Sequence, residues 1–130
     1  MPCRSVVIND GKVVLELWTG HVTFEDIAAH NQELLQNPSI AQGAAVLADC
    51  RTAHVDLPPE RLPEIADIHG NPLGPSKISR FAFLVPAEVY AQTHLFIGEV
   101  RKHGITAIVF TSLSVACQWL GVDPADVPQD

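Results

Sequence analysis

The sequence predicts an α/β fold: a mixed sheet of about five strands with an N-terminal antiparallel hairpin, and about four helices. Strand-like and helix-like segments alternate along the chain, Asp10-Gly11 separates two β-branched runs, and two short runs are entirely apolar. Such alternation is typical of parallel strands joined by right-handed helical crossovers. With 130 residues, 47% of them hydrophobic, the chain is long enough for one domain over residues 1–130.

Strands are predicted where β-branched or purely apolar residues gather. The first two such runs flank Asn9-Asp10-Gly11, and Asp-Gly in this position is a strong hairpin signal. The run that follows Gly43 is short and entirely apolar, as in strands that are buried on both faces. The predicted strands are residues 5–8, 12–18, 44–48, 77–85 and 105–110.

Helices are predicted from their capping residues and from apolar residues at helical spacing. Thr23 is placed to cap the amide of Asp26, and Val22 with Ile27 occupies the two positions of a hydrophobic staple. The predicted helices follow Thr23, Arg61, Pro86 and Ser112, and they end near Asn37, His69, Gly104 and Gly121. The remaining acidic tail, residues 122–130, is expected to be loosely held.

Composition and charge exclude several classes of partner. A net charge of −7 with only eight basic residues argues against nucleic acid and against anionic lipid surfaces. No apolar run approaches the roughly 20 residues of a membrane helix, so no membrane insertion is expected. The three cysteines form no CxxC pair, which suits a reducing compartment and predicts a cytoplasmic location. The expected partner is another protein or a small molecule.

Spaced positions along nearly the whole chain form a recognisable pattern: Trp18-x-Gly20-x-x-Thr23, Pro38, Asp49, residues 81–85, Val109-Phe110 and Ala116-x-x-Trp119-Leu120. Together these positions resemble the SpoIIAA-like (STAS-type) family. The resemblance implies a STAS-type α/β fold, shared in outline with Sec14-like lipid-binding domains. It also implies a non-enzymatic protein that is switched by phosphorylation of a serine after the central strand. Here that stretch reads Asp49-Cys50-Arg51-Thr52, without the serine, so the chain resembles the uncharacterised branch of the family.

Residues 49–54 are the predicted contact site, because ligands in open α/β sheets lie beyond the carboxyl ends of the strands. These residues are predicted to form a loop in which Arg51 is available to an anion and Thr52 or Ser112 donates hydrogen bonds. The alternative is a solvated loop in which Asp49 caps local amides and Arg51 pairs with a nearby acid. The candidate contact residues are Asp49, Cys50, Arg51, Thr52, His54 and Ser112.

No catalytic, metal or cofactor site is predicted. Cys50 with His54 would suggest a nucleophile pair only if the two side chains met, and a structural thiol is the other interpretation. The six histidines show no metal-binding spacing, and the glycines show no nucleotide-binding spacing. Glu16 and Arg80 each interrupt an apolar strand. Both are expected to face outward, or else to face one side together as an ion pair or a polar spot in a cavity floor.

The leading functional prediction is a non-enzymatic protein-interaction module, similar to bacterial regulators, which acts through residues 49–54 and the neighbouring helix starts. This hypothesis leaves open whether the chain acts alone or as a homodimer. A second hypothesis is a carrier of a small apolar or lipid-like ligand, with the sheet as the floor of its pocket, as in Sec14-like domains. A third is a thiol-dependent enzyme that uses Cys50.

Overall fold

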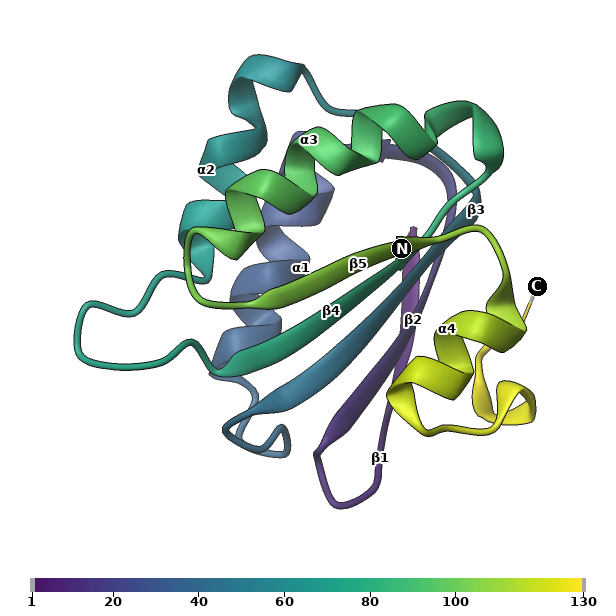
Figure 1. Cartoon of the computed structure of the whole chain (residues 1–130). Helices are drawn as coiled ribbons and strands as arrows, with labels where there is room; N and C mark the ends of the chain where they lie inside the picture. Colours follow the sequence, from purple (N-terminus) through teal and green to yellow (C-terminus); the bar gives the residue numbers. More distant parts are fainter. Residues whose placement is uncertain (1, 130) are drawn as a thin grey trace.

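The computed structural model describes residues 2–129 and contains a five-stranded sheet with helices on both faces (Figure 1). The strands lie side by side in chain order. β1 runs antiparallel to β2, and each later pair is parallel. The predicted α/β class with an N-terminal hairpin is therefore confirmed. The strands are β1 (Cys3–Ile8), β2 (Val13–Thr23), β3 (Ala44–Asp56), β4 (Ile78–Leu84) and β5 (Thr106–Phe110).

The hairpin turn forms where Asn9, Asp10 and Gly11 predict it. All three residues have positive φ angles, of 55°, 57° and 83°, which Asn, Asp and Gly tolerate better than other residues. Gly11 is also required for space, because a Cβ atom there would lie 2.2 Å from the carbonyl oxygen of Ser39. Its own carbonyl accepts a hydrogen bond of 2.8 Å from the amide of Ala41. The hairpin is thereby tied to the segment that leads into β3.

Between residues 2 and 129 the chain forms four α-helices, none of them long and apolar enough to cross a membrane. Thr23 caps the first helix as predicted. Its Oγ1 accepts from the amide of Asp26 at 3.2 Å, and the Asp26 carboxylate accepts from the amide of Thr23 at 3.0 Å, which completes a capping box. Ser112 accepts from the amide of Val115 in the same way. The helices are α1 (Phe24–Gln36), α2 (Leu62–Ile68), α3 (Tyr90–Arg101) and α4 (Leu113–Leu120).

Three helices, α1, α2 and α3, cover one face of the sheet, and α4 lies on the other (Figure 1). Successive side chains of β4 point to opposite faces of the sheet, so this one strand contributes to both cores. Phe81 and Phe83 belong to the core beneath α1, α2 and α3. Ala82 and Leu84 belong to the core beneath α4, where they are grouped with Leu120. We call these the first and the second face of the sheet.

Residues 49–54 are part of a strand, so the predicted loop is wrong. β3 continues to Asp56, and β2 continues alongside it to Thr23, with Cα partners from Thr19 and Thr52 onward. The pairing of β3 with β4 already stops at Asp49. The extension therefore runs past β4 as a two-stranded ribbon, held by backbone hydrogen bonds. Since most of its side chains are exposed, its sequence shows no apolar pattern.

The described part of the C-terminal tail packs on the second face. Pro124–Asp126 forms a short 3₁₀ turn, and Val127 is buried in the core beneath α4. The guanidinium of Arg4 donates a hydrogen bond to the carbonyl oxygen of Gln129. The expectation of a loosely held tail also covers Asp130, which lies outside the described residues.

Candidate functional site

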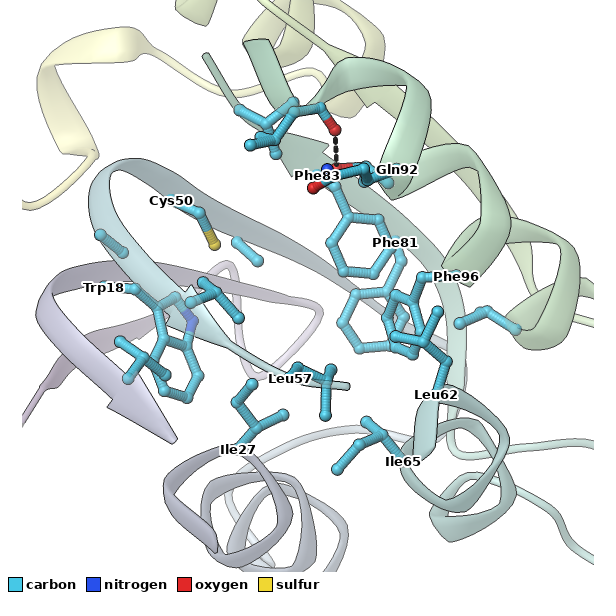
Figure 2. A pocket seen from close by; sticks show the side chains of 18 of the residues that line it. Trp18, Ile27, Cys50, Leu57, Leu62, Ile65, Phe81, Phe83, Gln92 and Phe96 are labelled. Carbon is cyan, nitrogen blue, oxygen red and sulfur yellow. Dashed lines mark hydrogen bonds between the residues drawn. The ribbon is translucent and has the colours of Figure 1, made fainter. Parts of the chain in front are cut away.

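A cavity of about 500 Å³ lies between the first face of the sheet and the three helices that cover it. Figure 2 shows Trp18 and the two phenylalanines of β4 on the sheet side, with Ile65 of α2 and Phe96 of α3 opposite them. Cavities of a few hundred to 1,000 Å³ with mainly apolar walls are typical of small-molecule sites. This cavity is the candidate functional site of the chain.

The aromatic side chains form a continuous wall. The rings of Phe81 and Phe83 are stacked with 5.2 Å between centroids, because the two residues alternate on one face of β4. Phe96 meets the edge of this stack at 5.4 Å from Phe83. His69 meets Phe81 in a T-shaped arrangement at 5.2 Å. Packed rings of this kind are rigid and offer a large apolar surface to a bound molecule.

The cavity is open to solvent between α3 and the β3 extension. Leu95 and Val55 both line the cavity although their exposed fractions are 61% and 43%. His54 and Gln92 are also exposed and line the cavity. Large apolar side chains that remain exposed at the rim of a hollow are a common feature of binding sites. These four residues form the mouth of the cavity.

Glu16 places a carboxylate in the cavity wall, and its predicted outward orientation is wrong. Only 3% of this residue is exposed. Its Oε1 accepts a hydrogen bond of 3.1 Å from Nε1 of Trp18, and its Oε2 lies 2.5 Å from Nε2 of His30. Burial disfavours the charged imidazole, but the hydrogen bond and charge of Glu16, helped by Glu33, outweigh it and raise the pKa of His30. The buried carboxylate is therefore paired, as such groups must be.

Arg80 does not take part in this polar spot. It lies on the second face of the sheet, where its guanidinium sits 5.3 Å from the ring of Trp119 and donates to the carbonyl oxygen of that residue. One alternative from the sequence was a polar spot in the floor of a cavity. The structure contains such a spot in the cavity wall, and Glu16 forms it without Arg80. Glu16 is level with Phe83 of β4, through Ala48 of the intervening strand β3. Arg80 lies three residues before Phe83, so it points to the opposite face of the sheet.

A second polar group in the wall is His69, of which 3% is exposed. Asn31 uses its Nδ2 to donate to the carbonyl oxygen of Ile27, so its Oδ1 is an acceptor. His69 Nε2 lies 2.8 Å from that oxygen and must therefore carry a proton. Burial, with a contribution from the charge of His103, lowers the pKa of His69 to about 4. The ring is neutral near pH 7, and its Nδ1 is a buried acceptor with no partner among the described residues.

Comparison with known proteins identifies the fold. No family model and no curated protein matches the chain. Its structure is similar to that of an uncharacterized protein of the DUF3478 family with a SpoIIAA-like fold, from Shewanella loihica PV-4, with a TM-score of 0.61 at 14% sequence identity. The match covers 91% of this chain and 93% of the other. The chain has a SpoIIAA-like fold. The fold implied by the sequence resemblance is thereby confirmed.

In this SpoIIAA-like fold, Asp49 and Arg51 pair with each other. Asp49 is buried, and its carboxylate accepts bonds of 3.0 and 2.9 Å from Nε and Nη2 of Arg51. The same carboxylate also accepts from the backbone amide of Arg51 at 3.2 Å. This geometry matches the alternative in which Asp49 caps a local amide and Arg51 pairs with an acid. Arg51 is therefore already engaged, and an anion would have to compete with this pair.

The other predicted contact residues are dispersed. Cys50 and His54 both line the cavity, but no hydrogen bond joins them among the described residues, and His54 stacks on His21 at 5.8 Å. Burial and the nearby charges of Glu16 and Asp49 raise the pKa of the Cys50 thiol, the reverse of what activates a nucleophile. Thr52 is exposed on the extension, and Ser112 caps α4.

Three polar residues of the cavity wall, Glu16, Asn31 and His69, were not candidate contact residues in the sequence. Glu16 had a visible signal, a charge within an otherwise apolar strand. His69 and Asn31 had none, because they come from different helices and meet only when α1 and α2 pack together. Short-range sequence spacing does not reveal a pair of this kind.

Proposed function

We propose that this protein binds a small, uncharged and largely apolar molecule in the cavity between the sheet and α1, α2 and α3. The observation that supports this proposal is the cavity itself, with its aromatic wall and its open mouth. Each Å² of apolar ligand surface that leaves water contributes roughly 25 cal/mol to binding. The apolar-ligand hypothesis is thus favoured over the interaction module, whose predicted contact residues do not form one surface.

An uncharged ligand is favoured by the groups in the wall. No lysine or arginine is among the described residues that line the cavity. His69 is neutral near pH 7 because its pKa is lowered to about 4, and the carboxylate of Glu16 is already paired with His30. An anionic head group would therefore lose its hydration without gaining a partner. A carboxylate ligand is expected to bind more weakly than the corresponding alcohol.

A hydrogen-bond donor on the ligand is favoured by His69. Its Nδ1 is a buried acceptor with no partner in residues 2–129, and an unmade hydrogen bond of this kind costs about 1–3 kcal/mol. A ligand hydroxyl or N–H group would remove that cost once the His69 ring shifts to bring Nδ1 to the cavity surface, since this nitrogen is itself buried. The proposed ligand is therefore an apolar molecule with one such donor, such as a long-chain or ring-containing alcohol.

The test is a calorimetric titration of the full chain with dodecanol and, separately, with dodecanoate. Saturable binding of the alcohol, at least tenfold tighter than that of the acid, is expected. Ala53→Phe places a ring in the cavity from a half-buried lining position and should weaken binding. Ala91→Phe adds the same ring at an exposed position of α3 outside the lining and should leave binding unchanged.

Two results would contradict the proposal. One is that neither ligand binds the wild-type protein. The other is that Ala53→Phe and Ala91→Phe, both shown by circular dichroism to be folded, bind the alcohol equally well. Tighter binding of the acid than of the alcohol would leave an apolar site but refute the uncharged ligand, because it would show that the wall tolerates a second carboxylate near Glu16.

A further inference from the structure

Three side chains with metal-binding atoms meet at the β1 edge of the first face. They are Cys3 of β1, Glu16 of β2 and His30 of α1, and one donor atom from each lies within 4.8 Å of the other two. Sγ of Cys3 is 3.8 Å from Nε2 of His30, and Oε2 of Glu16 is 2.5 Å from the same nitrogen. Three different donor types, a thiol, a carboxylate and an imidazole, thus converge on one point.

The fold holds all three side chains in place. In the β1–β2 hairpin Cys3 pairs with Trp18, and Ser5 pairs with Glu16, so Cys3 and Glu16 are diagonal neighbours on one face. His30 is presented by α1, and its ring meets Trp18 edge-on with 5.0 Å between centroids. Nε1 of Trp18 donates to Oε1 of Glu16. The second oxygen of the carboxylate is thereby left for His30 and the thiol.

We propose that Cys3, Glu16 and His30 form a binding site for a zinc ion. Zinc binds thiolate, imidazole and carboxylate ligands in tetrahedral geometry, and three protein ligands leave one position for water or another molecule. Its bond lengths to sulfur and nitrogen place those two atoms about 3.6 Å apart, close to the 3.8 Å between Cys3 and His30. The bond from Trp18 to Glu16 is the kind of outer contact that orients a metal-binding carboxylate.

Zinc binding at this site exchanges protons for the ion. The ion takes the place of the proton shared between Glu16 and His30, and it displaces the proton of the Cys3 thiol, so that both protons leave to solvent. The Glu16–His30 contact of 2.5 Å opens to the separation of about 3.3 Å that two ligands of one zinc ion adopt. Because Glu16 also lines the cavity, the ion would lie beside the proposed ligand site without depending on it.

The site departs from the sequence prediction of no metal centre. That prediction rested on short-range spacings such as paired histidines within one helix. Residues 3, 16 and 30 lie on three consecutive elements, each of which contributes a single ligand. Such a set has no spacing motif and is found only when the elements are assembled.

The test uses cobalt(II) as a spectroscopic probe for zinc in the full chain, after treatment with a chelator and its removal. The wild-type protein should bind one ion and show a sulfur-to-cobalt charge-transfer band, which zinc then abolishes by displacement. The band should be absent in Cys3→Ser, and the affinity should fall at least tenfold in His30→Gln. Cys50→Ala removes another half-buried thiol of the first face and should keep the band.

A thermal melt provides a second measurement of zinc binding and shows whether each variant is folded. Zinc should raise the Tm of the wild-type protein and of Cys50→Ala, but not that of Cys3→Ser. Cys3 is only partly buried at the sheet edge, so Cys3→Ser is expected to retain the circular dichroism spectrum of the parent. The proposal is overturned if the wild-type protein shows no charge-transfer band with one equivalent of cobalt. It is equally overturned if folded Cys3→Ser keeps the band.

Discussion

The carboxylate of Glu16 in β2 lies 2.5 Å from the imidazole of His30 in α1, measured from Oε2 to Nε2. Both side chains are largely shielded, with exposed fractions of 3% and 15%. The pair joins the sheet to the first helix in a layer where most other contacts are apolar. It supplies the carboxylate of the cavity wall and two of the three ligands of the proposed zinc site.

Removing one member of this pair is expected to be costly. In the presence of a chelator, His30→Ala should lower the free energy of unfolding by about 3–5 kcal/mol, because it leaves the Glu16 carboxylate buried without its partner. The double variant Glu16→Leu/His30→Leu should lose less than His30→Ala, since no charge is then buried. Urea unfolding at neutral pH measures both. A loss below about 1 kcal/mol for His30→Ala would show that water replaces the imidazole.

The lowered pKa of His69 predicts that the folded protein loses stability in acid. Burial lowers its pKa from 6.5 to about 4, so below pH 6.5 the unfolded chain takes up a proton that the folded chain excludes. Stability from this residue is complete above pH 6.5 and declines until pH 4. Between pH 7 and pH 5 the decline amounts to about 2 kcal/mol.

His69→Gln separates this effect from other acid-sensitive groups. The difference in unfolding free energy between wild type and variant should shrink by about 2 kcal/mol from pH 7 to pH 5, because only the wild type has the imidazole. Urea unfolding of both proteins at the two pH values gives the difference directly. If the difference is the same at both values, the imidazole takes up a proton as readily in the folded protein as in the unfolded chain, and the assigned buried acceptor at Nδ1 is wrong.

Arg51 is expected to affect stability more than recognition. Arg51→Ala removes both side-chain bonds to the buried Asp49 and should cost about 2 kcal/mol, the usual scale for hydrogen bonds to a charged group. Thr52→Ala, at an exposed neighbouring position, should change stability by less than about 0.5 kcal/mol. Chemical unfolding of the two variants measures the contrast. Unchanged stability of Arg51→Ala, with loss of a co-purified partner, would instead favour the interaction module.

Much of the fold was predictable because its determinants are local. Thr23 and Asp26 are three residues apart and form their capping box within one turn. The positive φ angles of Asn9, Asp10 and Gly11 follow from what these three residue types tolerate. The alternation of Phe81 and Phe83 with the residues between them assigns the two faces of β4 directly. Signals of this kind need no knowledge of the rest of the chain.

The β3 extension was missed for the opposite reason. Its residues pair with β2 through backbone hydrogen bonds while most of their side chains remain in solvent. The side chains are therefore not selected for apolar character, and a polar strand has the same composition as a loop. Only the presence of the neighbouring strand makes the segment regular.

The sequence by itself determined the order and kind of the elements, through caps, turn residues and apolar periodicity that act over a few positions. The tertiary structure decided the site. Glu16 faces inward only because His30 and Trp18 satisfy its carboxylate, and the pKa of His69 is lowered only because packing buries the ring near the charge of His103. Whether a polar residue is exposed or buried depends on partners far along the chain. No local pattern contains that information.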